Sequence, residues 1–140
     1  MKILLAVDGS SYTKQMLAYL AAHDEWLGTA HQYTVAYAQL ELPNGLLALL
    51  SEAAIRERHE ADAEMVFKPI RSFLEMQSIH AQFVHQVGAP GKVIAGLAEA
   101  GKFDLIMMGS HGHGALGGMV LGSTTTKVLA LCKTPVLVVR

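Results

Sequence analysis

The chain has 140 residues, enough for one ordinary domain and too few for two comfortable ones, so residues 1–140 are expected to form a single domain. Eleven Lys and Arg residues against twelve Asp and Glu give a formal net charge of −1, which excludes an overall basic field that would attract nucleic acid or anionic lipid. The composition is 51% apolar and 16% charged, which indicates strands buried on both faces, an interface between chains, or both.

The N-terminus and the cysteine content bear on location. The apolar run from Ile3 to Val7 stops at Asp8, short of the core of a signal peptide. No segment approaches the roughly 20 apolar residues of a membrane span. Cys132 is the single cysteine, so an intramolecular disulfide is excluded and a reducing compartment is favoured. We therefore expect a cytoplasmic protein without a membrane contact.

The first half of the chain alternates apolar runs with helical periodicity. Residues 2–7 (KILLAV) are continuously apolar and end at Asp8, the pattern of a central strand that runs into a polar turn. Ser10 or Ser11 is the expected N-cap of a helix that Gly28 stops. In chain order the predicted elements are a strand at 2–7, a helix at 11–26, a strand at 33–39, a turn at 43–45 and a helix at 46–77 that Pro69 kinks.

The second half continues the alternation. Apolar and polar residues alternate over 79–87, which is typical of an edge strand with one wet face. The remaining predicted elements are a helix from Pro90 to about Gly101, a strand at 104–108 (DLIMM), a helix from about Ser123 to Cys132 and a strand at 136–139 (VLVV). Alternating strands and helices predict a doubly wound α/β sandwich with a parallel sheet, in which ligands bind beyond the carboxyl ends of the strands.

A glycine-rich segment follows the fourth predicted strand. It reads Gly109-Ser110-His111-Gly112 and, after nine residues, Gly122-Ser123 at the start of the last helix. Glycines let backbone N–H groups approach phosphate oxygens closely, and the helix start adds unpaired N–H donors and the positive end of its dipole. The segment therefore predicts an anion-binding loop. A purely structural loop, with Ser123 as a helix cap, is the alternative.

The spacing Gly109-x2-Gly112-x9-Gly122-Ser123 resembles the nucleotide-binding signature of ATP-binding members of the universal stress protein family. The resemblance extends over nearly the whole chain. Its other segments are KILLAVDGS at 2–10, VGAP at 87–90, MGSHGHG at 108–114 and TPVLVV at 134–139. It implies a five-stranded sheet of order 3-2-1-4-5, of the adenine nucleotide α-hydrolase-like type, with the nucleotide across the ends of strands one, two and four.

The resemblance also implies roles for residues. Asp8 would hold the ribose hydroxyls, the backbone near Ala38 would meet the adenine edge, and Ala6 and Val7 would line that pocket. The phosphates would be held by Gly109, Gly112, Gly122, Ser123 and Thr124, with Met108 and His111 beside them.

Two positions depart from the family pattern, and Asp8 has a second interpretation. Tyr37 stands where the family has a histidine, which makes the assignment of Ala38 the weakest of the set. His113 stands where Arg or Lys is usual, which predicts weaker attraction of phosphate at neutral pH. Asp8 alone is also compatible with a simple turn residue after a strand.

The sequence does not support a dinucleotide-binding, P-loop, metal-binding or catalytic motif. Residues 112–117 spell Gly-x-Gly-x-x-Gly, but no helix opens within these glycines and no acidic residue follows at the required distance, so a dinucleotide site is rejected. A P-loop is absent from the sequence. His111 and His113, even with His59 and Glu60, lack a metal-ligand spacing. No motif places a nucleophile beside a base, so we expect at most slow ATP hydrolysis.

The sequence therefore predicts a binding module that responds to ATP, ADP or AMP, and it leaves open whether Mg²⁺ accompanies the nucleotide. The apolar strand at 136–139 and the family resemblance predict a symmetric homodimer through this strand, with a monomer as the alternative. A dimeric scaffold that holds no nucleotide and a slow ATP hydrolase are the competing hypotheses for function.

Overall fold

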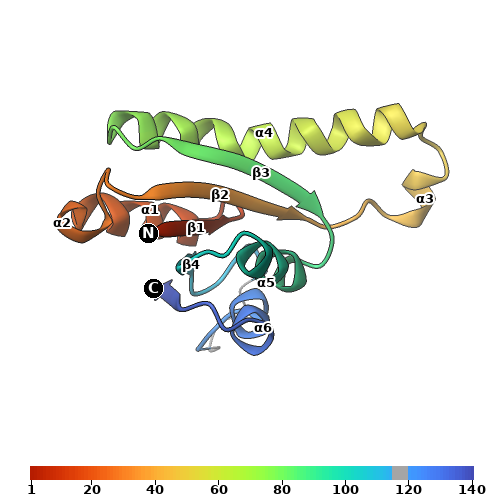
Figure 1. Cartoon of the computed structure of the whole chain (residues 1–140). Helices are drawn as coiled ribbons and strands as arrows, with labels where there is room; N and C mark the ends of the chain where they lie inside the picture. The colour runs from red at the N-terminus through yellow and green to blue at the C-terminus, as the bar shows by residue number, and fades with distance from the viewer. Residues whose placement is uncertain (115–119) are drawn as a thin grey trace.

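The computed structural model describes residues 1–114 and 120–140 and contains a five-stranded sheet (Figure 1). The strand order is β3-β2-β1-β4-β5, and each neighbouring pair is parallel. The strands are β1 (Lys2–Val7), β2 (Gln32–Gln39), β3 (Ala81–Val87), β4 (Leu105–Gly109) and β5 (Val136–Val139). The predicted doubly wound α/β sandwich of order 3-2-1-4-5 is thereby confirmed.

The strands form because their burial matches their position in the sheet. In β1, the central strand, Ile3, Leu4 and Leu5 are completely buried although their side chains point to alternate faces. In β3, Gln82 and Gln86, which point to the same face of the sheet, are exposed, and among the described residues β3 pairs only with β2. The prediction of an edge strand with one wet face is therefore confirmed.

The described residues contain six helices. They are α1 (Ser11–Ala22), α2 (Asp24–Leu27), α3 (Asn44–Leu47), α4 (Glu52–Met76), α5 (Pro90–Ala100) and α6 (Ser123–Leu131). The predicted helices at the C-terminal half, α5 and α6, agree with the sequence analysis to within one residue at each end. Of the described helices, none is both long and apolar enough to cross a membrane.

The predicted helix at 11–26 is wrong in extent, because it breaks at His23. This residue leaves helical geometry with φ −126° and ψ 45°. Its ring stacks on Tyr19 at 3.9 Å between centroids, and its Nδ1 lies 2.8 Å from the Tyr19 carbonyl oxygen. No glycine or proline marks the break, so the helical period gave no warning of it.

The predicted turn at 43–45 and the long helix at 46–77 are also corrected. The turn residues begin the short helix α3, and α4 begins separately after Ser51. Ser51 Oγ accepts a hydrogen bond from the N–H of Ala54 at 3.2 Å, so it caps α4. Pro69 lies inside α4, and the kink expected there stays a prediction.

The helices cover both faces of the sheet, as Figure 1 shows with α4 along β3 on one side and α5 and α6 on the other. One buried cluster joins Leu5 of β1 to Leu20 of α1 and Phe67 of α4. The opposite cluster joins Leu4 of β1 to Ile94 of α5. Burial of these side chains on both faces accounts for the high apolar content.

The arrangement of β1, β2 and β4 determines where a ligand can bind. The chain leaves β1 for β2 on one side and later enters β4 on the other. The order therefore reverses between β1 and β4, and the crevice beyond their carboxyl ends is the expected site. Near this edge, Ala6 and Ala38 face the α5 side of the sheet, and their small side chains leave space below α5.

Candidate functional site

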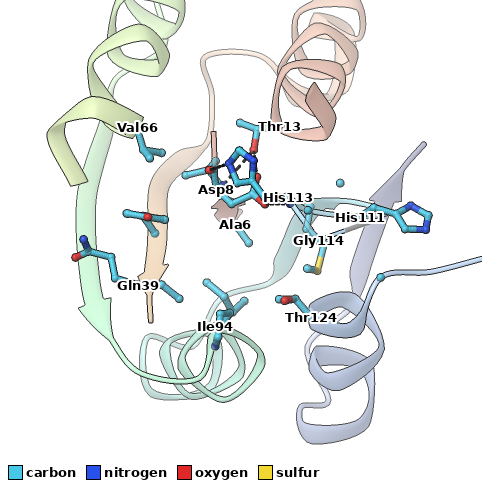
Figure 2. Close-up of a pocket in the computed structure, with 18 of the residues that line it drawn as sticks. Ala6, Asp8, Thr13, Gln39, Val66, Ile94, His111, His113, Gly114 and Thr124 are labelled. Atoms are coloured by element: carbon cyan, nitrogen blue, oxygen red, sulfur yellow. Dashed lines mark hydrogen bonds between the residues drawn. The ribbon is translucent and has the colours of Figure 1, made fainter. Parts of the chain in front are cut away.

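A pocket of about 590 Å³ lies at the carboxyl ends of β1, β2 and β4 (Figure 2). Helix α4 and the first turns of α5 and α6 complete its walls. Its volume is typical of small-molecule sites, which measure about 300–1,000 Å³. All the residues singled out from the sequence line it: Ala6, Val7, Asp8, Ala38, Met108, Gly109, His111, Gly112, Gly122, Ser123 and Thr124.

Asp8 ends β1 and uses its two carboxylate oxygens differently. Oδ1 accepts hydrogen bonds from the N–H of Ser10 at 2.9 Å and from Oγ1 of Thr13 at 3.0 Å. These bonds form the turn that leads into α1, as the alternative interpretation of Asp8 expected. Oδ2 is directed to the glycine-rich loop instead, so Asp8 combines a structural oxygen with one on the pocket side.

His113 closes the glycine-rich loop onto Asp8. Its backbone N–H donates to Asp8 Oδ2 at 3.2 Å, and its Nε2 lies 2.7 Å from the Asp8 carbonyl oxygen. Figure 2 shows the ring of His113 directly over Asp8 and beside Thr13. A Cβ at Gly112 would stand 2.4 Å from Asp8 Oδ2, so a glycine at 112 permits this approach. We call this pair of bonds the Asp8–His113 contact.

The N-terminus of α6 opens toward the same pocket. Gly122 occupies the N-cap position, so the alternative in which Ser123 caps the helix is wrong. The first intrahelical bond runs from the N–H of Thr126 to the Gly122 carbonyl at 3.0 Å. The N–H groups of Ser123, Thr124 and Thr125 therefore precede the helical ladder, and together with the helix dipole they favour an anion.

Two bonds hold α6 against the end of β4. The N–H of Gly122 donates to the Ser110 carbonyl at 2.7 Å, and Oγ1 of Thr125 donates to the Gly109 carbonyl at 3.1 Å. A Cβ at Gly122 would lie 3.0 Å from the Cα of His111. The glycine thus allows the loop and the helix start to pack closely, and the position of the N–H groups in the pocket depends on this packing.

Gly109 and His111 contact α1 as well as the pocket. A Cβ at Gly109 would stand 2.6 Å from the Cβ of Tyr12. The ring of His111 lies 5.1 Å from the ring of Tyr12, and its Nδ1 lies 3.0 Å from Oγ of Ser110. Figure 2 shows this ring pointing away from the pocket. At His111 the backbone is therefore better placed than the ring to meet a ligand.

The far wall of the pocket was missed by sequence reasoning. Asp62, Met65 and Val66 of α4 line it together, because positions i, i+3 and i+4 share one face of a helix. Tyr37 at the end of β2 lines it too. The spacing on α4 is visible in the sequence, but nothing in the sequence indicates that this face covers the end of β2.

Electrostatics link this wall to Asp8. Burial raises the pKa of Tyr37 above its ordinary value, and the negative charges of Asp62 and Asp8 raise it further. The phenol is therefore neutral at physiological pH. Both carboxylates act on the same group, so both contribute to the potential inside the pocket.

The structure bears on the dinucleotide and metal motifs that the sequence analysis rejected. Residues 115–117 of the Gly-x-Gly-x-x-Gly string lie outside the described residues. Within the described ranges, no three His, Cys, Asp or Glu side chains gather in a way that could hold a metal ion.

Comparison with known sequences places the chain in a family. All of it, residues 1–140, matches the model of the universal stress protein family. "Universal stress protein in QAH/OAS sulfhydrylase 3'region" from Thermus aquaticus is 35% identical over 138 residues, which are 99% of this chain and 97% of that protein. Universal stress protein Slr1230 from Synechocystis is 28% identical, and its match covers 99% of this chain but 42% of that longer protein.

Comparison with solved structures finds proteins of the same fold. The chain is similar to protein MJ0577 of Methanocaldococcus jannaschii with a TM-score of 0.82 and 27% identity, covering 99% of this chain and 94% of that one. The chain is also similar to a universal stress protein from Archaeoglobus fulgidus in complex with dAMP. The TM-score is 0.69 and the identity 18%, and the match covers 100% of this chain and 98% of that one. A universal stress protein family protein from Arabidopsis thaliana with AMP bound has a TM-score of 0.70 and 12% identity, and the match covers 99% of this chain and 90% of that one. The last two structures establish similarity of fold alone. Because the family model matches residues 1–140 and the Thermus aquaticus protein is 35% identical over nearly its whole length, this chain belongs to the universal stress protein family.

Proposed function

We propose that this chain binds an adenine nucleotide (ATP, ADP or AMP) in the pocket at the carboxyl edge of its sheet, and acts as a nucleotide-responsive module of the stress response. Family membership supports the proposal, as do the relatives of the same fold that carry AMP and dAMP. The observation that carries it lies in this chain. A single pocket brings the carboxylate of Asp8 and the open N-terminus of α6 together.

The parts of a nucleotide match the parts of the pocket. The small side chains of Ala6 and Ala38, with Ile94 of α5 opposite, leave an apolar space for a base. The N–H groups at the start of α6, from Ser123 onward, suit a phosphate. Mg²⁺, where it accompanies the nucleotide, would enter with the phosphates, because the described residues offer no preformed cluster of metal ligands.

Asp8 lies between these two parts and suits the ribose. Its Oδ1 accepts hydrogen bonds from Ser10 and Thr13, whereas Oδ2, within the described part of the chain, accepts only the N–H of His113. A carboxylate oxygen has two acceptor positions. A ribose hydroxyl can therefore donate to Oδ2 beside the N–H of His113, which makes the Asp8–His113 contact compatible with a bound nucleoside.

One observation favours a second candidate, a scaffold that holds no nucleotide. Gly109 packs so closely against Tyr12 that this packing alone explains why a glycine occupies position 109, without any ligand. The motif alone thus does not distinguish the two functions, and ligand binding must be measured. Slow hydrolysis of ATP remains the third hypothesis, which steady product formation abolished by Asp8→Ala would support.

The homodimer belongs to the same proposal. Within the described ranges, β5 pairs with β4 alone, so its other edge is unpaired there, and Leu129 and Leu131 on α6 are 48% and 44% exposed. A second copy that pairs through β5 would cover an apolar edge in a symmetric, isologous interface. Sedimentation at micromolar concentration should give a dimer, and a monomer would remove dimerisation from the proposal. The cytoplasmic location expected from the sequence stays a prediction.

The first experiment identifies the ligand and locates its phosphate. Protein purified without added nucleotide is denatured, the released small molecules are identified by mass spectrometry, and the stripped protein is titrated with AMP, ADP and ATP in a calorimeter. Thr124→Asp places a carboxylate at the start of α6, where it suits the helix dipole and repels a phosphate. We expect AMP affinity to fall by about tenfold.

Ala130→Asp is the matched control, because Ala130 lies further along the same helix, is exposed and does not line the pocket. Its AMP affinity should equal that of the unmodified chain within a factor of about two. Equal affinities of the two variants would contradict the phosphate position. Failure of AMP, ADP and ATP alike to bind the unmodified chain would favour the scaffold.

A further inference from the structure

A carboxylate that the proposed function does not use lies in the α4 wall of the pocket. Asp62 lines the pocket together with Met65 and Val66, which share its face of the helix. Figure 2 shows Val66 of α4 and Ile94 of α5 on opposite sides of the pocket. The face of α4 that carries Asp62 therefore lies across the pocket from α5.

Asp62 has no hydrogen-bond or ion-pair partner within residues 1–114 and 120–140. An ion pair on α4 joins Arg71 to Glu64, and Glu64 does not line the pocket. Asp62 is half-buried. A carboxylate that is partly withdrawn from water is stabilised by accepting hydrogen bonds, so Asp62 suits a ligand that donates them.

The electrostatics of Tyr37 place Asp62 near the end of β2. After burial, the charge of Asp62 raises the pKa of this phenol more than the charge of Asp8 does. Tyr37 immediately precedes Ala38, which borders the apolar space assigned to the base. Asp62 is thus at the base end of the pocket, whereas Asp8 is at the position assigned to the ribose.

The other side chains at the base end offer few polar atoms to a ligand. Nε2 of Gln39 donates to a backbone carbonyl of α4 at 2.9 Å and its Oε1 is buried, so this amide is not available. In the first turns of α5, Pro90 has no N–H and Ile94 is apolar. Among the described lining residues there is no Lys or Arg. The polar side-chain groups open to a base are therefore the Asp62 carboxylate and the Tyr37 hydroxyl.

Backbone groups near Ala38 lie beside these side chains and are compatible with a bond from the base to Asp62. An exocyclic amino group has two N–H donors, so a backbone carbonyl and a carboxylate can each accept one. A purine with a carbonyl oxygen at the same position presents an acceptor instead. The negative charge of Asp62 repels that oxygen.

We infer that Asp62 selects the base: its carboxylate accepts a hydrogen bond from the exocyclic amino group of adenine and disfavours hypoxanthine, which carries a carbonyl in that place. Because this assigns a specificity-determining residue to the same pocket, it rests on the proposed function. The selection acts on the base alone and is independent of how the phosphates are held.

The test compares AMP, IMP and purine riboside 5′-monophosphate, which lacks the amino group, by calorimetry on the stripped full chain. The three ligands share the ribose phosphate, so contacts at Asp8, at the glycine-rich loop and at α6 cancel in the comparison. One hydrogen bond to a half-buried carboxylate corresponds to about threefold in affinity. We expect purine riboside monophosphate to bind about threefold more weakly than AMP, and IMP about tenfold more weakly.

Asp62→Asn should remove the preference for adenine, because an amide is a weaker acceptor than a carboxylate and can donate to a carbonyl. AMP affinity should fall by about threefold and IMP affinity should rise by about threefold, so their ratio should fall from about ten to about one. Glu60→Gln is the matched control, since Glu60 is exposed on α4 and does not line the pocket. It should leave the AMP-to-IMP ratio unchanged.

Asp62→Ala separates the contact with the amino group from the repulsion of the carbonyl, and Ala is well tolerated in a helix. The variant should lower AMP affinity by about threefold and leave the affinity of purine riboside monophosphate unchanged. An equal loss for both ligands would show that Asp62 does not contact the amino group.

The outcomes separate the role of Asp62 from the proposed function. IMP that binds the unmodified chain as tightly as AMP, or an AMP-to-IMP ratio that Asp62→Asn does not change, would overturn the role of Asp62 and leave nucleotide binding standing. Failure of all three ligands to bind the unmodified chain would overturn both. A urea titration checks that each variant is folded, and if Asp62→Asn does not fold, the Asp62→Ala comparison decides.

Discussion

The two ends of the pocket are built differently. At the α6 end, the backbone forms the surface: Gly112 permits the loop to reach Asp8, and Gly122 leaves the helix N-terminus uncovered. At the α4 end, side chains form the surface, with Tyr37 and Asp62 among them. The first end depends on residues close in sequence, and the second on how a helix is placed over a strand.

This difference predicts different consequences of substitution. At the α6 end, a single added Cβ meets the backbone or a side chain that hydrogen bonds fix in place. Nucleotide affinity and the free energy of unfolding should therefore change together. At the α4 end side chains border open pocket volume, so affinity should change with little effect on folding. Four substitutions test this contrast.

Gly109→Ala should have the largest effect. Its Cβ would stand 2.6 Å from the Cβ of Tyr12 and 3.1 Å from the backbone of Tyr12, so α1 or β4 must shift. We expect the free energy of unfolding to fall by about 2–3 kcal/mol, as for other overpacked sites, in a urea titration. Gly96→Ala is the control, because nothing lies within 4 Å of a Cβ there; it should stabilise α5 by up to about 1 kcal/mol. Equal stabilities would show that Gly109 is not constrained by packing.

Asp8→Ala should have the second largest effect. It removes the acceptor of the Ser10 N–H and the Asp8–His113 contact on the carboxylate side. Loss of a charged hydrogen-bond partner costs about 1.5–3 kcal/mol, so AMP affinity measured by calorimetry should fall by at least about tenfold. Asp24→Ala, at an exposed position on α2, should leave affinity unchanged. An Asp8→Ala variant that folds and binds AMP normally would remove the ribose role.

Ala38→Leu tests the base end. The larger side chain would fill the space below α5 that Ala6 and Ala38 leave. Affinity for adenosine and for AMP should fall together, by about tenfold, because the base is common to both, while the urea midpoint should stay the same or rise. Ala18→Leu, exposed on α1, controls for added apolar volume. A loss confined to AMP would show that the base lies elsewhere.

Asp62→Asn should have the smallest effect, a lower titration midpoint for Tyr37. A nearby carboxylate opposes formation of the phenolate and so raises the pKa of Tyr37; removing its charge should lower that pKa. Tyr33 is an internal control on the same strand, because burial alone raises its pKa to about 12. Ultraviolet absorbance of tyrosinate against pH measures both. An unchanged Tyr37 midpoint would show that Asp62 does not act on the pocket.

The sequence predicted the α6 end more completely than the α4 end for a physical reason. The glycine spacing concerns local backbone geometry, so the placement of Gly112 and Gly122 at the pocket follows from a short segment. Their predicted role in holding phosphate stays a prediction. The spacing did not predict that Gly122 rather than Ser123 occupies the N-cap, nor that the ring of His111 turns toward Tyr12. Both outcomes depend on tertiary packing.

The strand limits and the edge position of β3 were predictable because continuous apolar runs differ from the alternating pattern of β3, whereas the full strand order was implied by the family resemblance. The helices were predicted less well where no proline or glycine marks a boundary, as at His23. The position of α4 over Tyr37 could not be predicted at all, because an amphipathic face indicates that a helix packs but not against which part of the sheet.

The most direct test of nucleotide binding in this pocket is a titration of isotopically labelled protein with AMP, followed through its backbone amide NMR signals. With AMP bound in this pocket, the signals of Ala38, at the base end, and of Gly112 and Thr124, at the α6 end, should shift at the same AMP concentration. Saturable shifts confined to other parts of the chain, or no shifts at millimolar AMP, would contradict it.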